Sequence, residues 1–205
     1  MKILHISASP KREGSSSWWL SQQIVGRLAQ RAGHAAVTVR DLYADPIAHV
    51  DDAYAEALGS SAGKADEGAA GGALGMSEQL IRELELADSV VIGTPMHNYT
   101  VPSALKAWID HVVRVRRTFA ITPDGKAGLL RDKPVYVGIA AGGRFSGPSA
   151  RQADFLTPYL KAVLATIGLH DLRFYCMEGL AQGPDVVAAE RERMELVLGA
   201  AFSRA

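Results

Sequence analysis

The sequence has one cysteine, no excess charge of either sign and no long apolar run. A single cysteine, Cys176, cannot form an internal disulfide, which is consistent with a reducing compartment. Lysine plus arginine and aspartate plus glutamate both number 22, so the chain lacks the basic footprint of a protein that binds nucleic acid or an anionic membrane. No apolar stretch approaches the roughly 20 residues that cross a bilayer, and no signal peptide is visible. We therefore expect a cytoplasmic protein with neither a nucleic-acid nor a membrane partner.

Several motifs of catalysis are also absent. There is no glycine fingerprint of correct spacing for a dinucleotide, no P-loop lysine, no G-x-S-x-G elbow and no C-x₅-R phosphatase loop. The six histidines show no metal-ligand spacing and no second cysteine exists, so we expect no metal site. Hydrophobic residues make up 48% of the 205, which is enough for a substantial core in one domain spanning residues 1–205.

Short β-type runs alternate along the chain with longer helical patterns. The expected strands are Lys2–Ile6, Ala36–Asp41, Ser89–Thr94, Pro134–Ala141 and Asp171–Cys176. Helices are expected from the serines at 15–17 to near Gly33, over Ser77–Ala87, from Pro102, over Pro158–Ile167 and after Pro184. This alternation predicts an α/β fold: a doubly wound, five-stranded parallel sheet with helices on both faces. We expect the strand order 2-1-3-4-5, which is one of the two common orders of doubly wound sheets.

Two stretches depart from the alternation. Ala53–Gly75 is rich in alanine, glycine and serine and is interpreted as a mobile connection with a short helix at its start. Arg117–Leu130 contains the turn sequence Thr122-Pro-Asp-Gly125 between apolar ends and is interpreted as a hairpin.

Serines gather where the first strand enters the first helix, at Ser9, Ser15, Ser16 and Ser17. Unpaired N–H groups and the positive end of the helix dipole can hold a phosphate there, and the hydroxyls add donors without any cation. Such a pocket suits a bound mononucleotide better than a triphosphate that requires Mg²⁺ and lysine. The alternative is that the serines merely cap the helix.

Two further loops leave the carboxyl ends of the third and fourth strands, where a sheet of this order binds its ligand. They comprise Pro95, Met96, His97, Asn98 and Tyr99, and then Ala140, Ala141, Gly142 and Gly143. Backbone N–H groups of the first loop can bind the edge of a flat polar ring. The paired glycines let the main chain approach that edge closely, and Met96 offers an apolar surface to a ring face.

These features together resemble one family. The matching features are Ser9 with Ser15-Ser-Ser17, Pro95-Met-His-Asn-Tyr99, Leu105-Lys106 with Asp110, Thr118-Phe119, Gly142-Gly143, Thr157-Pro-Tyr-Leu160, Ile167-Gly168 and Glu178-Gly179. The chain resembles the FMN-dependent NADH-azoreductases, which are flavodoxin-like NAD(P)H:quinone oxidoreductases. It departs from them at His97 and Tyr99, where the family commonly has Tyr and Phe. Ala140-Ala141 stands where the family often has Ser-Arg.

The resemblance implies a cofactor, a reaction and an assembly. The serine loop would hold the phosphate of tightly bound FMN, and the other two loops would hold its ring system. NADH or NADPH would reduce the flavin and leave before a quinone or azo acceptor takes its place, a ping-pong exchange that needs no catalytic side chain. Family members are homodimers with two flavin sites at the interface, and Phe119 matches a position whose aromatic ring the partner contributes.

Other interpretations remain beside this one. The chain could be a flavin-binding electron carrier for protein partners or, less in keeping with its loops, a phosphoester hydrolase. His97 could contact flavin or substrate, or be an ordinary loop residue, and Phe119 could belong to the hairpin core. His5 is expected to be a satisfied core residue, and Cys176 a buried, inert thiol.

Overall fold

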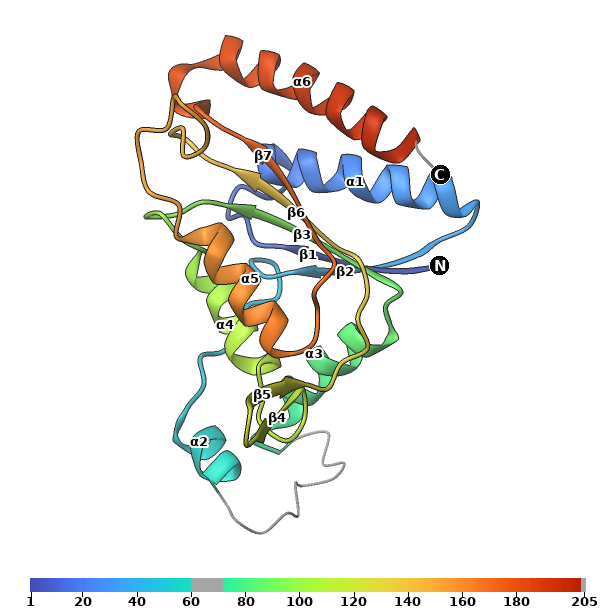
Figure 1. The fold of residues 1–205 in the computed structure, drawn as a ribbon, viewed down its shortest axis with the longest axis vertical. Helices are drawn as coiled ribbons and strands as arrows, with labels where there is room; N and C mark the ends of the chain where they lie inside the picture. Colours follow the sequence, from blue (N-terminus) through green and yellow to red (C-terminus); the bar gives the residue numbers. More distant parts are fainter. Residues whose placement is uncertain (60–71, 204–205) are drawn as a thin grey trace.

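A computed structural model describes residues 1–59 and 72–203 of the chain. It contains a five-stranded parallel sheet of order β2-β1-β3-β6-β7 (Figure 1). Strands β4 and β5 are not part of this sheet and form a separate hairpin. The sheet strands are β1 (Lys2–Ser7), β2 (Ala36–Asp41), β3 (Ser89–Pro95), β6 (Val135–Ala140) and β7 (Leu172–Met177). Counted along the sheet, this order is 2-1-3-4-5, so the predicted topology is confirmed.

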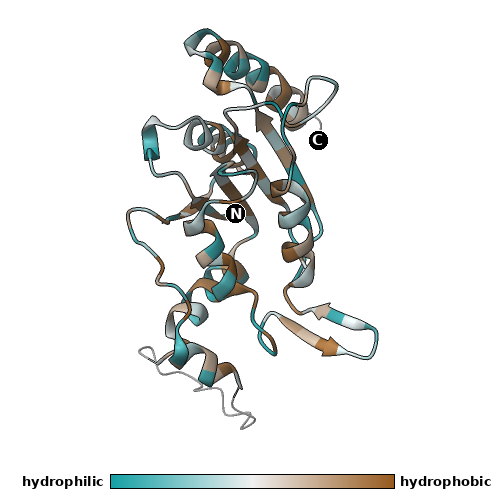
Figure 2. Ribbon diagram, turned by 90° about the vertical axis from the view of Figure 1, so that its left-hand side faces the viewer, coloured by the Kyte–Doolittle hydropathy of each residue, from teal (hydrophilic) through white to brown (hydrophobic). Residues whose placement is uncertain are grey.

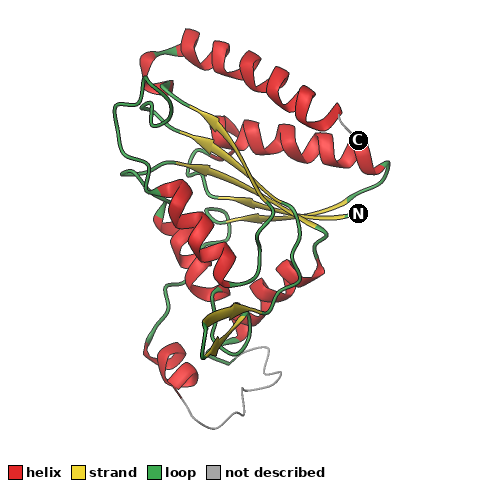
Figure 3. Ribbon diagram, viewed as in Figure 1, coloured by secondary structure: helices red, strands yellow, loops and turns green. Residues whose placement is uncertain are grey.

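Helices cover both faces of the sheet, as predicted (Figure 3). On one face lie α1 (Ser16–Ala32) and α6 (Pro184–Ser203). On the other lie α3 (Gly75–Leu86), α4 (Ser103–Val112) and α5 (Leu156–Thr166). The short α2 (Asp52–Gly59) and the 3₁₀ turns η1 (Arg12–Gly14) and η2 (Leu180–Gln182) complete the described helical segments.

The central strands are buried from both sides, which explains their continuous apolar sequence. Successive side chains of a strand point to opposite faces. Ile3 of β1 therefore packs with α1 and α6, while Leu4 packs with α3, α4 and α5. Figure 2 shows the apolar residues concentrated along these strands. The edge strand β2 differs, because its Val37 and Val39 are 41% and 50% exposed.

Two prolines occupy other positions than the sequence predicts. Pro102, expected as the first helical residue, is instead the N-cap of α4, with an extended ψ of 154°. Pro158, expected to begin its helix, is the third residue of α5, which starts at Leu156. Both positions are tolerated because the first-turn N–H groups of a helix have no partner within it.

The two irregular stretches have different outcomes. The hairpin is confirmed as β4 (Phe119–Thr122) and β5 (Gly125–Gly128), paired antiparallel around the predicted turn. Of the expected connection over residues 53–75, the helix at its start is present as α2. Residues 60–71 of that connection lie outside the described residues.

Candidate functional site

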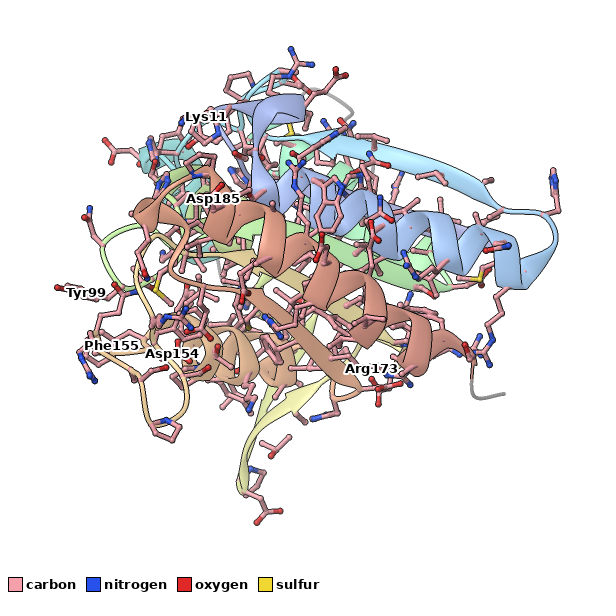
Figure 4. All side chains as sticks on the ribbon, turned by 90° about the horizontal axis from the view of Figure 1, so that it is seen from above. Lys11, Tyr99, Asp154, Phe155, Arg173 and Asp185 are labelled. Atoms are coloured by element: carbon pink, nitrogen blue, oxygen red, sulfur yellow. The ribbon has the colours of Figure 1, made fainter. Side chains whose placement is uncertain are left out.

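Three loops begin side by side at the carboxyl edge of the sheet, because β1, β3 and β6 are neighbours. Ala8 N–H donates to Gly93 O at 2.8 Å, and Met96 N–H donates to Ala140 O at 2.9 Å, so each loop starts against the next. In Figure 4 Lys11 and Tyr99, from the first two loops, lie in the left-hand half of the view, whereas Arg173 near the start of β7 lies to the right of them. The fold therefore brings the serine, Pro95–Tyr99 and glycine loops together, as the topology predicts.

The serine loop contains both a helix cap and free donors. Ser15 is the N-cap of α1, and its Oγ accepts a hydrogen bond from Trp18 N–H at 3.1 Å, so the capping interpretation is correct for Ser15. Its Oγ also lies 3.3 Å from Oγ of Ser17. The N–H groups of Ser16 and Ser17 donate to no described residue, and the side chains of Ser9 and Ser17 are buried. This arrangement of hydroxyls and unpaired amides at a helix N-terminus can bind a phosphate.

Gly93 sets how closely α1 approaches the sheet, and the sequence analysis did not identify it. A Cβ at this position would lie 2.5 Å from Oγ of Ser21 and 3.0 Å from the backbone oxygen of Ser17. The start of α1 can therefore pack on β3 only because residue 93 is glycine. A glycine inside the apolar run 90–94 was the available signal, since a strand glycine often marks a close backbone approach.

The second loop is a tight two-residue turn. His97 and Thr100 exchange hydrogen bonds in both directions, each at 2.9 Å. Asn98 and Tyr99 between them have φ of +47° and +71°, the combination of a type I′ turn. Their N–H groups donate to no described residue, and the side chains of residues 97–99 are exposed. This turn therefore presents two backbone donors beside the third loop.

In the third loop the carbonyl groups of residues 140–144 each accept a hydrogen bond, whereas the central amides are free. The carbonyl oxygens of Ala141, Gly142 and Gly143 accept hydrogen bonds from residues 179–181 at 3.1–3.2 Å. The carbonyl of Arg144 accepts from residues 151 and 152. By contrast, the N–H groups of Gly142, Gly143 and Arg144 donate to no described residue. Residues 142–144 therefore present free hydrogen-bond donors, which match a ligand edge that carries acceptors.

Gln152 joins the second and third loops, and no sequence signal pointed to it. Its Nε2 donates to Sδ of Met96 at 3.1 Å. A Cβ on Gly143 would lie 2.3 Å from its Oε1, so the glycine makes room for this side chain. Pro95 and Met96 are half-buried beside it, while Ala140 and Ala141 are buried. Ala140 and Ala141 therefore contribute through backbone atoms.

His5 lies beneath α1 as a neutral side chain. It is fully buried, and burial lowers the pKa of its imidazole to about 4. Its Nε2 lies 2.9 Å from Oγ of Ser21, but its Nδ1 has no partner among the described residues. The expectation of a satisfied core histidine is thus confirmed for one ring nitrogen and wrong for the other.

Phe119 lies away from the three loops of its own chain. It is the first residue of β4, and the hairpin packs against the C-terminal end of α5, where Gly128 meets Gly168 (Figure 1). The N-terminus of α5 is at the loop edge, and its eleven residues span about 16 Å. Within one chain Phe119 is 8% exposed, and Nζ of Lys126 from the hairpin lies 5.3 Å from the centre of its ring.

Cys176 is half-buried, where the sequence analysis expected it buried. It lines a cavity of about 380 Å³ between the exposed edge of β7 and α6. Burial of the thiol raises its pKa to about 12, so it stays protonated near neutral pH, as an inert cysteine would.

Two classes of feature are not found within residues 1–59 and 72–203. In these ranges no helix has both the length and the apolar character needed to span a bilayer. The same ranges contain no group of three histidine, cysteine, aspartate or glutamate residues placed to hold a metal ion.

Comparison with known proteins places this site in a family. A family model described as having a flavodoxin-like fold matches residues 1–200. The chain is 47% identical over 205 residues to FMN-dependent NADH:quinone oxidoreductase 2 of Cupriavidus pinatubonensis, covering 100% of this chain and 98% of the relative. It is 46% identical over 187 residues to FMN-dependent NADH:quinone oxidoreductase 4 of Pseudomonas fluorescens, covering 91% and 88%. The chain belongs to this oxidoreductase family.

Solved structures share the family's fold along nearly the whole chain. The crystal structure of the azoreductase AzrA aligns with a TM-score of 0.81 at 25% identity, covering 96% of this chain and 98% of the other. An FMN-dependent NADH-azoreductase from Bacillus anthracis, solved in complex with FMN, aligns with a TM-score of 0.79 at 23% identity, covering 99% and 98%. The likeness to this second structure extends to the fold alone.

Proposed function

We propose that this protein is an FMN-dependent NADH:quinone oxidoreductase that also reduces azo compounds. The observation that carries the proposal is the set of unpaired backbone amides on three adjacent loops, together with relatives of that activity at 46–47% identity over most of the chain. An electron carrier or a phosphoester hydrolase with the same fold is not favoured by these relatives.

FMN fits the unpaired groups of the site. The serine loop supplies buried hydroxyls and free amides for a phosphate at the N-terminus of α1. The amides of Asn98, Tyr99, Gly142 and Gly143 supply donors for the carbonyl oxygens of a flat ring. When bound, FMN supplies the two-electron chemistry between NADH and the acceptor.

The protein's own contribution is position and electrostatics. Free amides held in a fixed orientation stabilise negative charge on a ring without reorganising, which is the usual source of such stabilisation in enzymes. Tyr99, with half of its surface exposed, offers an aromatic wall at the mouth of the loops. No side chain in these loops is needed as an acid or base, and we assign none.

NADH and the acceptor would occupy this one site in turn. The departures at His97 and Tyr99 place an imidazole and a phenol where the ring of an acceptor would enter, and both side chains are exposed. They are therefore the residues that we expect to set acceptor preference.

We further propose a homodimer that completes each site. Apolar side chains are exposed both at the loop edge, in Tyr99 and Phe155, and on the hairpin, in Ile121. A symmetric pair of chains could cover both surfaces. It would also bring the hairpin with Phe119 of one chain to the loops of the other, which the chain's own geometry does not allow.

Purification and kinetics test the function. We expect a yellow protein, or a colourless one that takes up FMN, and rapid oxidation of NADH by a soluble benzoquinone with no protein partner. Parallel lines in a double-reciprocal plot would support alternate occupancy. Failure to bind FMN would contradict the proposal, and electron transfer that requires a second protein would favour the carrier. Sedimentation of Ile121→Lys against the parent protein tests the dimer.

A further inference from the structure

Glu178 follows β7 and turns its carboxylate towards the glycine loop. Its Oε2 accepts hydrogen bonds from Phe145 N–H at 2.7 Å and Ser146 N–H at 3.1 Å. Its Oε1 accepts from the Ser146 hydroxyl at 2.5 Å. The residue is 8% exposed, and a carboxylate is buried at acceptable cost only when donors surround it. All three of these donors belong to residues 145 and 146, which continue the glycine loop.

The backbone after Glu178 holds the same loop from the same side. Gly179 N–H donates to Gly143 O at 3.2 Å, and Ala181 N–H donates to Gly142 O at 3.1 Å. Gly179 can make this bend because its φ is +75°, in the left-handed region. The segment therefore binds the loop's carbonyl groups, while the Glu178 side chain binds its last two amides.

The consequence is a division of the loop's amides into two sets. Those of residues 145 and 146 face Glu178, and those of residues 142–144 have no described acceptor. Because each peptide unit is planar, fixing the later amides and the earlier carbonyls restricts how the units between them can rotate.

We propose that Glu178 is a positioning residue for the ring-binding amides of residues 142–144. It touches neither flavin nor substrate, and it acts by holding the far end of the loop so that these amides face the acceptor atoms of a flat ring. This inference rests on the proposed function, since the ring is that of the expected FMN.

Replacement of Glu178 should weaken binding of the flavin ring and not binding of the phosphate. Riboflavin lacks the phosphate but carries the same ring, so Glu178→Ala should raise the dissociation constants of FMN and riboflavin by a similar factor of about ten, the cost of leaving buried donors unpaired. Glu178→Gln should restore affinity to within about threefold of the parent. Its amide oxygen can accept from residues 145 and 146, while its NH₂ group donates to the Ser146 hydroxyl.

A matched control lies in the same cavity. Glu190 lines it with Glu178 and pairs with Arg193 at 2.6 Å, but it accepts no hydrogen bond from residues 142–146. Its Oε2 accepts from Glu178 N–H at 3.3 Å, a contact that glutamine can keep. Glu190→Gln removes one negative charge from the same place and should leave both flavin affinities unchanged.

Hydrogen exchange on the purified protein supplies a readout independent of flavin affinity. In Glu178→Ala the amides of Phe145 and Ser146 should exchange at least about tenfold faster, and in Glu178→Gln they should stay protected. If Glu178→Ala does not fold, Ser146→Ala can replace it, because it removes one donor to the same carboxylate. This variant should raise the dissociation constants of FMN and riboflavin about twofold to threefold.

The outcomes separate the two proposals. A parent protein that binds neither flavin overturns the proposed function, whereas the exchange measurement still tests whether Glu178 holds the loop. If the parent binds FMN and Glu178→Ala binds both flavins as tightly, Glu178 is not a positioning residue and the function stands. A loss confined to FMN, or no rescue by glutamine, also overturns the inference.

Discussion

Nε2 of His5 lies 2.9 Å from Oγ of Ser21, in a pair that joins β1 to the first turns of α1 beneath the serine loop. Ser21 Oγ also donates to Trp18 O at 2.9 Å, so a neutral imidazole, a hydroxyl and a helix carbonyl form one buried chain. The ring of Trp18 covers the imidazole, with centroids 5.2 Å apart. The helix that carries Ser15–Ser17 is therefore hydrogen-bonded, through Ser21, to a histidine that is neutral in the folded protein near neutral pH.

This pair makes stability depend on pH. The pKa of His5 falls from 6.5 to about 4 on folding, so between these values the unfolded chain binds the proton and the folded chain does not. The contribution of His5 to the free energy of unfolding should be fully present above about pH 6.5. It should decrease by about 3 kcal/mol as the pH falls towards 4. Urea denaturation at a series of pH values measures the slope.

Replacement of His5 isolates its contribution. His5→Gln should be less stable at neutral pH but show a shallower loss of stability over the same acid range. His34→Gln, on the surface, controls for the removal of one histidine. An acid slope that His5→Gln leaves unchanged would assign the pH dependence to other groups.

Ser15 and Ser17 should contribute to binding of the FMN phosphate and not to binding of the flavin ring. In Ser15→Ala/Ser17→Ala, two hydroxyl donors are lost from the start of α1, and we expect FMN to dissociate about tenfold to a hundredfold more readily. Ser15→Ala alone also removes the N-cap and should lower stability by about 1 kcal/mol. Fluorescence titration with FMN and riboflavin measures both affinities.

Riboflavin is the control for that double variant. Its affinity should be nearly the same for the parent and the variant, because it has no phosphate for the hydroxyls to bind. An equal loss for both flavins would mean that the serines act through the fold of α1.

Gly93 should tolerate no side chain. Gly93→Ala places a methyl group against Ser21 and the backbone of Ser17, which should cost about 1–3 kcal/mol and push the start of α1 away from the sheet. FMN retention should fall together with stability. Thermal denaturation and the flavin content of the purified variant measure the two effects.

Gly26 provides the comparison within α1. It is exposed in the interior of that helix and a Cβ there meets nothing, so Gly26→Ala should stabilise the protein by about 0.5–1 kcal/mol. If Gly93→Ala is as stable as Gly26→Ala, the close approach of α1 to β3 is not required.

The backbone of Tyr99 should be strained by its positive φ, while its aromatic ring should contribute to binding of the acceptor. A non-glycine residue in the left-handed region costs about 1–3 kcal/mol, and Asn-Gly is the preferred sequence of a type I′ turn. Tyr99→Gly should therefore raise the free energy of unfolding by about 1 kcal/mol and raise the KM for a quinone. Tyr99→Phe keeps the ring and should keep the KM. A destabilised Tyr99→Gly protein would show that the ring packs at the turn.

Local sequence patterns were sufficient for the elements and for the edge of the sheet that carries the site. The apolar runs of β1, β3 and β6, with a serine, Asn98 or glycine following each, placed three polar loops at adjacent strand ends. The hairpin around Thr122-Pro-Asp-Gly125 was equally readable, because its turn chemistry is local. Helix starts near Pro102 and Pro158 were off by one and two residues, since proline is compatible with several first-turn positions.

The sequence alone determined the strands, the helices, the loops between them and the residue types in those loops, because hydrophobic periodicity and turn residues act over short distances in the chain. Only the tertiary structure decided which of those groups are free. Three features of the site depend on atoms that are distant in sequence. They are the unpaired amides of residues 142–144, the close approach of α1 to β3 at Gly93, and the hydrogen bonds from residues 145 and 146 to Glu178. Hydrogen-bond partners and close approaches between such atoms arise when the layers pack, and no local pattern encodes them.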